Sequence, residues 1–295
     1  MTKAAVYGYG NVGKEAVNAL LCAPDMALCG VVNPSRAGQK TVGGQPIVAS
    51  LDELPGVQAV ILATPSRSVP GLAQELLAKG ICTVDSFDIH SRIPEVWGEL
   101  NSVARASGTA AVTAAGWDPG SDSVIRCLLE AMAPQGITYT NFGPGMSMGH
   151  TVAVKAIKGV KDALSVTIPI GTGLHRRMVY VELEEGYALD EVAAHIKADD
   201  YFAHDETHVN LVKSVKDVMD TGHGVLLERK GASGIASNQN FQFKMSINNP
   251  ALTAQILVAS VRAVLRQTPG CYTMIEIPPV DFLPGSRGDA VARLV

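Results

Sequence analysis

Hydrophobic residues in the first third of the chain fall into short β-rich runs that alternate with stretches of helical periodicity. The aliphatic runs predict strands at 3–7, 27–32, 59–63 and 81–84. The stretches between them predict helices at 11–22, 69–79 and 95–107, and a further apolar run covers 110–115. Strands that alternate with helices in this way are typical of a parallel sheet with crossover helices, which is an α/β fold.

The pattern changes at 116–120, where turn residues predict a hinge. From residue 137 onward strand-like runs dominate, interrupted by one helical stretch at 189–199. This second region is therefore predicted to be a mainly antiparallel sheet. Its predicted strands include 163–170, 178–183, 209–215 and 241–247.

The C-terminal part carries a helix predicted at 251–266, with Asn249 as its cap and Pro250 in its first turn. This helix is apolar almost all round, so it needs cover on several sides, and we expect it to pack beside the first sheet. The predicted division is a first domain at 1–118, a second α+β domain at 119–249 and a returning segment at 250–295.

Composition narrows the class of protein. With 47% hydrophobic and 18% charged residues, the 295-residue chain is expected to fold into globular domains. A net charge of -4 without a run of Lys or Arg argues against a nucleic-acid partner, and no apolar stretch approaches the length of a membrane span. The five cysteines are scattered and form no CxxC pair, which argues against a metal site and favours a reducing cytoplasm.

A GxGxxG pattern formed by Gly8, Gly10 and Gly13 follows the first predicted strand and opens the first predicted helix. In this context the first glycine permits a tight turn, the second lets the backbone approach a pyrophosphate, and the third lets helix and strand pack closely. The free N–H groups of the helix N-terminus favour phosphate binding. We therefore predict a Rossmann-type doubly wound sheet with a dinucleotide cofactor, in preference to a glycine-rich turn without a ligand.

The end of the second predicted strand indicates which dinucleotide is bound. An NAD enzyme normally places Asp or Glu there, but this chain has Asn33, Pro34, Ser35 and Arg36. A hydroxyl and a guanidinium can bind a 2′-phosphate by charge-assisted hydrogen bonds. The cofactor is therefore predicted to be NADP. The alternative is that Arg36 is a solvated loop residue.

Polar residues follow three predicted strands, at the edge where ligands bind in open α/β sheets. The segment 64–66 is predicted to border the cofactor, although a strand-terminating turn has the same composition. Asp88 and Asp118 follow the next two apolar runs. Carboxylates there can hold a substrate ammonium group and help to remove its proton. Asp118 precedes Pro-Gly, so a turn-forming role is equally compatible with the spacing.

The second domain supplies candidates of opposite charge. One arginine of His175-Arg176-Arg177, just before a predicted strand, can clamp a carboxylate, and the other is expected to face solvent. His223 lies in the glycine-flanked segment 221–224, which we interpret as a flexible turn. From the residues alone, Asn249 can equally be a helix cap.

Four motifs together resemble the meso-diaminopimelate dehydrogenase family, over nearly the whole chain. They are GYGNVG at 8–13, TVDSFD at 83–88, GWDPG at 116–120 and GPGMSMGH at 143–150. The third and fourth are more specific than the dinucleotide pattern. The resemblance implies NADP-dependent oxidative deamination of meso-2,6-diaminopimelate at its D-centre, which yields ammonia and L-2-amino-6-oxopimelate, a precursor of tetrahydrodipicolinate. In reverse, the reaction feeds the synthesis of lysine and of a cell-wall precursor.

The resemblance also implies roles for individual residues. Asp88 and Asp118 match catalytic positions near the reacting amino centre, with the aromatic Trp117 beside them. The implied substrate-binding set is Trp117, Phe142, Met148, Gly149, Thr167, Arg177, His223 and Asn249. The implied cofactor-binding set is Gly8, Tyr9, Gly10, Asn11, Val12, Gly13, Asn33, Ser35, Arg36, Ala63, Thr64, Pro65, Ser66, Ser86, Phe87, Pro119 and Gly120.

The chain departs from the better-known members between Thr167 and Arg177, where a short turn at 171–173 replaces a longer insertion, so it resembles the family's shorter branch. The resemblance implies a homodimer formed through the second domain. Two alternatives stay open. One is another NADP-dependent reductase, such as a dihydrodipicolinate reductase, which typically has histidine and lysine in place of GWDPG. The other is an NADP-binding sensor without turnover.

Overall fold

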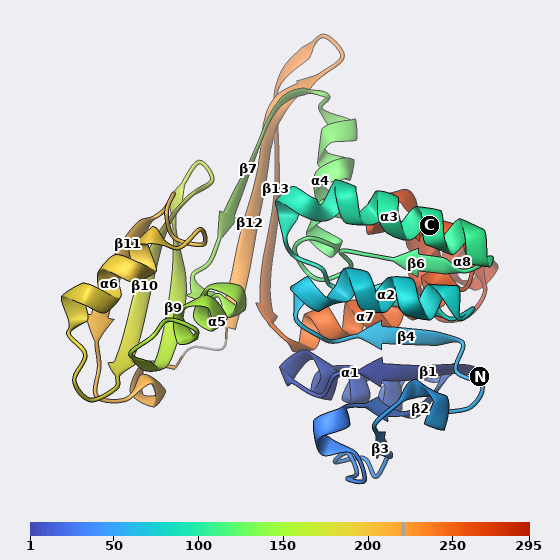
Figure 1. Ribbon diagram of the computed structural model, residues 1–295. Coiled ribbons are helices and arrows are strands. Elements are labelled where there is room, and N and C mark those ends of the chain that lie inside the picture. Colours follow the sequence, from blue (N-terminus) through green and yellow to red (C-terminus); the bar gives the residue numbers. More distant parts are fainter. Residues whose placement is uncertain (220–221) are drawn as a thin grey trace. The chain divides into compact units, whose positions relative to one another are not determined.

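The computed structural model describes residues 1–219 and 222–295, and they form two compact units (Figure 1). The first unit contains Met1–Cys127 together with Pro250–Val295, and the second contains Leu128–Asn249. The units therefore meet in the sequence inside helix α4 (Ser121–Met132), beyond the boundary predicted at 118. The segment from 250 onward belongs to the first unit.

Seven strands of the described chain form one parallel sheet in the first unit, in the order β14-β6-β5-β4-β1-β2-β3. The predicted Rossmann-type doubly wound sheet is confirmed, whereas two short strands, β3 and β14, were not predicted. The strands are β1 (Thr2–Tyr7), β2 (Met26–Val32), β3 (Ile47–Val48), β4 (Ala59–Leu62), β5 (Cys82–Asp85), β6 (Ala110–Val112) and β14 (Gly270–Tyr272).

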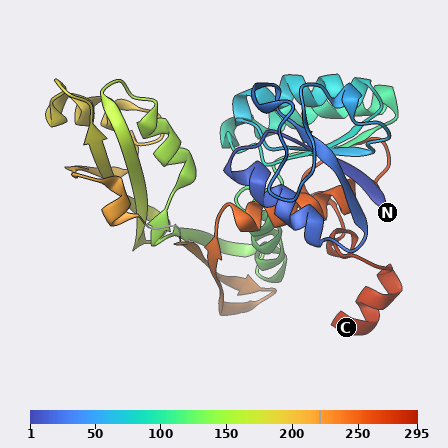
Figure 2. The same ribbon diagram turned by 90° about the horizontal axis from the view of Figure 1, so that it is seen from below.

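Helices cover both faces of this sheet, as Figure 2 shows. Alternating strand residues point to opposite faces, so Ala4 and Val6 of β1 join one buried cluster and Ala5 joins the other. The first cluster includes residues of α1 (Asn11–Cys22) and α7 (Ala251–Val264), which pack beside each other. The second includes residues of α2 (Val69–Ala78) and α3 (Ile93–Ser107). The all-round apolar character of α7 is explained by this burial.

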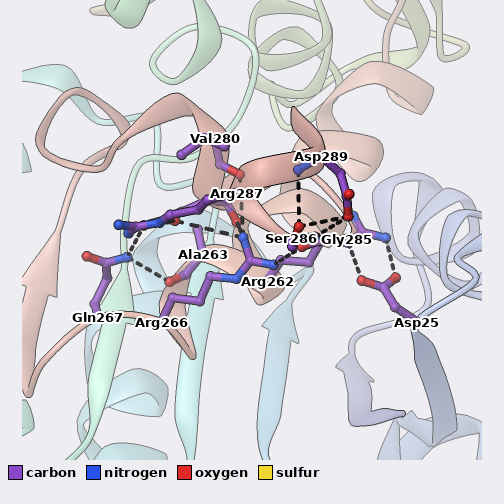
Figure 3. A network of polar contacts seen from close by, with 11 residues as sticks. Asp25, Arg262, Ala263, Arg266, Gln267, Val280, Gly285, Ser286, Arg287 and Asp289 are labelled. Atoms are coloured by element: carbon purple, nitrogen blue, oxygen red, sulfur yellow. Dashed lines mark hydrogen bonds and ion pairs between the residues drawn. The ribbon is translucent and has the colours of Figure 1, made fainter. Parts of the chain in front are cut away.

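A network of arginines and carboxylates holds the C-terminal segment in the first unit (Figure 3). Arg262 on α7 donates two hydrogen bonds to Asp25, of 2.8 and 2.7 Å. Asp281, which is fully buried, accepts two hydrogen bonds from Arg287 at the start of α8 (Arg287–Leu294) and one from Gln267. The Arg287 hydrogen bond holds the pKa of Asp281 below its usual range.

The predicted asparagine cap of α7 is wrong. The N-cap residue is Pro250, which already has helical backbone angles and makes no side-chain capping hydrogen bond. Proline has no N–H to leave unsatisfied, so it suits the helix start without a cap.

The second unit contains two sheets within the described residues. One has the order β11-β10-β9-β8 and the other the order β13-β12-β7. Helices α5 (Met148–Lys155) and α6 (Leu189–Ala198) supply residues to the buried cluster of the first of these sheets. The strands are β7 (Gln135–Phe142), β8 (Gly145–Met146), β9 (Val160–Gly171), β10 (Leu174–Leu183), β11 (Glu206–Leu211), β12 (Gly222–Ser233) and β13 (Ala236–Asn248).

The predicted antiparallel character of the second region is confirmed for most pairs, but β10 and β11 pair in parallel. The strand predicted at 209–215 ends earlier, at Leu211, and Val215–Val218 forms a 3₁₀ turn. The sequence 175–177 lies within β10 rather than before a strand. No helix among the described residues is long and apolar enough to cross a membrane.

Candidate functional site

The glycine-rich loop between β1 and α1 is shaped by two close backbone contacts. Gly8 has φ +101°, and a Cβ there would collide with the carbonyl of Ala63. A Cβ at Gly13 would collide with the carbonyl of Gly8. At Gly10, by contrast, a Cβ would meet no described atom within 4 Å. Gly10 is also the N-cap of α1, and no side chain of the described part caps this helix. The loop therefore leaves open space beside unsatisfied N–H groups, which fits a phosphate.

The residues after β2 face this loop with a positive group. Pro34–Arg36 form a 3₁₀ turn, and Ser35 Oγ donates a 2.8 Å hydrogen bond to Asn33 Oδ1. The guanidinium carbon of the exposed Arg36 lies 5.8 Å from the centre of the Tyr9 ring, which is a cation–π geometry. Tyr9 is itself buried. Arg36 thus lies against Tyr9 of the glycine loop, with its guanidinium just beyond the end of β2.

Asp88 and Ser66 connect the ends of β4 and β5. Ser66 Oγ donates a 2.6 Å hydrogen bond to Asp88 Oδ1, and the backbone N–H of Asp88 donates to Ser66 Oγ at 3.4 Å. Asp88 remains exposed. The segment Ala63–Ser66 and the acidic residue after β5, both predicted from the sequence, therefore lie at the same edge of the sheet as the glycine loop.

Asp85, which sequence reasoning missed, is the buried support of this edge. Its Oδ1 accepts hydrogen bonds from the N–H groups of Phe87 and Ala114 and from Thr113 Oγ1, at 2.9, 3.2 and 2.9 Å. Its Oδ2 is buried and has no hydrogen-bond partner in residues 1–219 and 222–295. Burial raises the pKa of Asp85 to about 6. Asp85 therefore ties the loop that carries Asp88 to the end of β6.

The loop after β6 places Trp117 and Asp118 against the first turn of α4. Trp117 is 6% exposed. Arg126 Nη1 lies 2.6 Å from Asp118 Oδ1, and the Asp118 side chain is 8% exposed. The Asp118–Pro119 peptide bond is cis. A turn-forming role for this segment is real, because Gly116 N bonds to the Pro119 carbonyl at 2.9 Å, but Asp118 is also held in an ion pair.

Asp122, a second residue that sequence reasoning missed, lies behind this loop. Its side chain is fully buried, and its backbone N–H donates a 3.1 Å hydrogen bond to the Trp117 carbonyl. Burial, and then the charge of Asp118, raise the pKa of Asp122 to about 7, while Arg126 and the Trp117 side chain act to lower it. Trp117 and the three charged residues Asp118, Asp122 and Arg126 thus form one cluster within the first unit.

Arg177 and Thr167 face each other in the second unit, because β9 and β10 pair them directly. Arg177 Nη1 donates to Thr167 Oγ1, and Arg177 Nε donates a 2.6 Å hydrogen bond to Asp205. Thr167 is fully buried and the Arg177 side chain is 11% exposed, whereas Arg176 is 42% exposed and pairs with Glu206. The expectation that one arginine of this pair faces solvent fits Arg176.

The rings of Phe142, His175 and His223 lie close together, at the end of β7 and near the starts of β10 and β12. His175 Nε2 accepts a 2.8 Å hydrogen bond from the Phe142 N–H, and the rings of Phe142 and His175 have centroids 5.6 Å apart. The His223 ring centroid lies 6.5 Å from that of Phe142. His223 is 7% exposed and belongs to β12, so its assignment to a flexible turn is wrong. Thr221, part of the same predicted turn, lies outside the described residues.

The GPGMSMGH motif builds the start of α5. Gly149 and Met148 occupy its first turn, and both are partly exposed. Ser147 Oγ and His150 Nδ1 lie 2.7 Å apart, and the His150 ring packs edge-on against Tyr201 and Phe202. Burial, followed by the charge of Arg177, lowers the pKa of His150 to about 4, so His150 is neutral near pH 7.

Each unit thus brings together a distinct part of the predicted set. The first groups the glycine loop, Arg36, Ser66, Asp88 and the Trp117–Asp118 loop at the carboxyl edge of one sheet. The second groups Phe142, Thr167, Arg177 and His223, while Asn249 lies at its end. Sequence reasoning missed Asp85, Asp122, Arg126 and Asp205. Asp122 and Arg126 are spaced i, i+4, but they lie on helix α4, which was not predicted, so this spacing was not recognised as a signal.

Comparison with known proteins identifies similar chains along the full length. Residues 116–249 match the family described as diaminopimelic acid dehydrogenase C-terminal domain, and residues 1–87 match a CoA binding domain family. The meso-diaminopimelate D-dehydrogenase of Bacteroides fragilis is 57% identical over 295 residues, which cover 99% of each chain.

Two solved structures have similar folds. Diaminopimelate dehydrogenase of Corynebacterium glutamicum in complex with diaminopimelate has a TM-score of 0.90 at 29% identity, covering 100% of this chain and 99% of that one. An engineered D-amino acid dehydrogenase bound to NADP⁺ has a TM-score of 0.87 at 28% identity, with the same coverage.

Proposed function

This chain belongs to the meso-diaminopimelate D-dehydrogenase family, and from that premise we propose that it oxidatively deaminates meso-2,6-diaminopimelate at the D-centre with NADP. Loss of a hydride to NADP and of a proton leaves an imine, which water hydrolyses to ammonia and L-2-amino-6-oxopimelate. The oxo acid cyclises to tetrahydrodipicolinate, and the reaction is reversible. One observation carries the proposal: the glycine loop, Asp88 and Asp118 lie after β1, β5 and β6 of one parallel sheet. A dinucleotide loop and two carboxylates then share the edge at which such sheets bind ligands.

The residues present fit NADP. Gly10 leaves open space at an uncapped helix N-terminus, and Arg36 offers a guanidinium where an NAD enzyme would have a carboxylate. We assign Gly8–Gly13 to the pyrophosphate, Asn33, Ser35 and Arg36 to the ribose phosphate, and Ala63–Ser66 with Ser86, Phe87, Pro119 and Gly120 to the walls of the cofactor site. When bound, NADP supplies the nicotinamide carbon that accepts the hydride.

Asp88 and Asp118 are assigned to the substrate's D-centre. Ser66 occupies Oδ1 of Asp88, which leaves Oδ2 to receive a proton from the ammonium group before the hydride leaves. Asp118 is held by Arg126 and orients the same group, with Trp117 beside it. The 11% exposure of Arg177 and its Thr167 and Asp205 contacts support a role in clamping a substrate carboxylate. Phe142, Met148, Gly149, His223 and Asn249 complete the proposed substrate-binding set.

We also propose a homodimer in the cytoplasm. The five cysteines are free thiols, as suits a reducing compartment. Strand β13 is an edge strand of its sheet among the described strands, and the apolar residues on one of its faces, Phe241, Phe243, Met245 and Ile247, remain partly exposed. An apolar edge strand of this kind favours burial by a second copy. Sedimentation of the purified protein tests this assignment.

The proposed reaction is tested by following NADPH absorbance with purified protein, NADP and a panel of meso-diaminopimelate, its LL isomer and simple D-amino acids. NADPH formation with the meso isomer and much less with the others is the expected result. A protein that binds NADP but produces no NADPH with any of these substrates contradicts the assigned reaction and favours the sensor alternative. The full-length 57% identity already argues against a dihydrodipicolinate reductase.

The cofactor assignment is tested with Arg36→Glu. A carboxylate there repels the 2′-phosphate, so the dissociation constant for NADP is expected to rise about 30-fold while that for NAD changes little. Arg105→Glu, at an exposed arginine in the last turn of α3, is the matched control. Equal effects of Arg36→Glu on both cofactors contradict the proposed phosphate contact.

A further inference from the structure

A buried acidic residue, Asp122, lies behind Trp117 and Asp118 and has no role in the reaction as described so far. It occupies the first turn of α4, and Arg126 follows it by one helical turn on the same face. Arg126 in turn bonds to Asp118 at 2.6 Å. A helix N-terminal carboxylate ordinarily lies in solvent, whereas Asp122 is fully buried. This position needs a reason beyond helix capping.

We propose that Asp122 is a positioning residue with two effects. It fixes the loop that carries Trp117, and it offsets the positive charge of Arg126, so that the cluster presents a net negative charge to the substrate's ammonium group. The proposal rests on the assigned deamination. Asp118 and Arg126 alone form a pair with no net charge, which attracts a cation weakly. An ionised Asp122 gives the three residues a net charge of -1. Its N–H bond to the Trp117 carbonyl fixes the loop that carries both Trp117 and Asp118.

The charge of this cluster depends on pH near neutrality. Asp118 and Arg126 are the charged groups that act on Asp122, and burial is the largest influence. Because the pKa of Asp122 is raised to about 7, the cluster is neutral below this pH and negative above it. Substrate affinity should therefore improve as pH rises through this range, while the substrate's ammonium group is still charged.

The test measures KM for meso-diaminopimelate and kcat from pH 5.5 to 9, together with the dissociation constant for NADP. For the unmodified protein, KM is expected to fall about tenfold between pH 6 and pH 8. Asp122→Asn preserves the shape of the side chain and leaves the backbone N–H bond to the Trp117 carbonyl in place. Its KM is expected to stay high across the range, about tenfold above the unmodified protein at pH 8.5, with kcat changed less and NADP affinity unchanged.

A double variant separates charge from structure. Asp122→Asn with Arg126→Gln removes one charge of each sign and leaves Asp118 as the net charge of -1, so KM at pH 8.5 is expected to recover at least threefold from the Asp122→Asn value. Asp281→Asn is the matched control, because it alters another fully buried carboxylate far from this loop in the sequence. Its pH profile is expected to match that of the unmodified protein.

Three results would overturn the proposal. One is a KM of the unmodified protein that does not vary between pH 6 and 8, which needs no variant. Another is an Asp122→Asn enzyme that retains the wild-type KM profile, and the third is a double variant with a higher KM than Asp122→Asn. An unmodified protein that forms no NADPH at any pH instead contradicts the assigned reaction itself, so the two failures are distinct.

Discussion

Asp281 and Asp122 are both fully buried carboxylates of the first unit, yet their surroundings have opposite effects. Asp281 receives hydrogen bonds from Arg287 and Gln267, and its pKa is lowered. Asp122 has a carboxylate neighbour, Asp118, and its pKa is raised to about 7. A buried charge with sufficient donors stabilises a fold, and one beside a like charge destabilises it. The C-terminal network thus contributes to stability, whereas the cluster of Trp117, Asp118, Asp122 and Arg126 contains residues that we propose to bind the substrate.

The largest expected effect is on catalysis and concerns Asp118, which is proposed to bind the substrate. Asp118→Asn removes the charge that is proposed to hold the ammonium group, so kcat/KM for meso-diaminopimelate should fall about 10²–10³-fold, or ~3–4 kcal/mol. The melting temperature should change little, because the Asn amide still fits beside Arg126. A loss of folding stability with unchanged kcat/KM would place Asp118 with the structural carboxylates instead.

The second largest effect is expected on the stability of the fold and concerns Asp281. Asp281→Ala leaves Arg266 and Arg287 without their buried acceptor, and we expect it to lower the free energy of unfolding by roughly 2–3 kcal/mol at pH 7. Because the pKa of Asp281 is depressed when folded, its contribution is present above the unfolded pKa and is lost as pH falls through the folded one. Urea unfolding at pH 7 and pH 3 measures this, and the deficit should shrink at pH 3.

The helices and strands of the first unit could be predicted where the pattern of hydrophobic residues is long enough to show a period. The helix predicted at 11–22 coincides with α1, and the strands of the first sheet agree within a residue or two, because each has enough aliphatic residues to show its period. Strands β3 and β14 have two and three residues, too few to show any period. Their pairing is decided by the rest of the sheet.

The errors in the second unit have a different cause. The glycines at 222 and 224 suggested a turn around His223, but the segment belongs to strand β12. A glycine is needed at position 224 because a Cβ there would lie 2.8 Å from the Met245 carbonyl oxygen across the hairpin. A glycine required by a neighbouring strand has the same sequence signature as one required by a turn. Only the tertiary pairing distinguishes them.

The candidate site was predictable where its residues follow predicted strands and not where residues support them from within the protein. Asp88, Asp118 and Arg36 follow predicted strands, so the parallel topology alone indicates their edge. Asp85 and Asp122 support them from within the protein, and an aspartate in sequence is expected to be exposed. Their burial follows from the packing of β6 and α4, which no local pattern reveals.

A third prediction tests whether Asp122, in contrast to Asp281, destabilises the fold when it is ionised. Because the folded pKa of Asp122 lies above that of an unfolded aspartate, the folded state binds more protons, and stability falls as pH rises from about 4 to about 7. Asp122→Asn removes this penalty, so it should raise the free energy of unfolding by about 1–2 kcal/mol at pH 8 and by little at pH 4. Urea unfolding at both pH values, with Asp281→Asn as control, measures the difference.

The smallest expected effect concerns exposure within the C-terminal network. Arg287 donates to Asp281 at 2.9 and 2.8 Å, but its side chain is 63% exposed, so water and salt screen the pair from one side. Arg287→Ala should therefore lower the free energy of unfolding much less than Asp281→Ala does, with a still smaller effect in 0.5 M salt. Gln267 and Arg266 still contact Asp281 in this variant. A loss as large as that of Asp281→Ala would mean that this one arginine, rather than the combined donors, makes the buried carboxylate stabilising, and the contrast with Asp122 would then depend on a single partner.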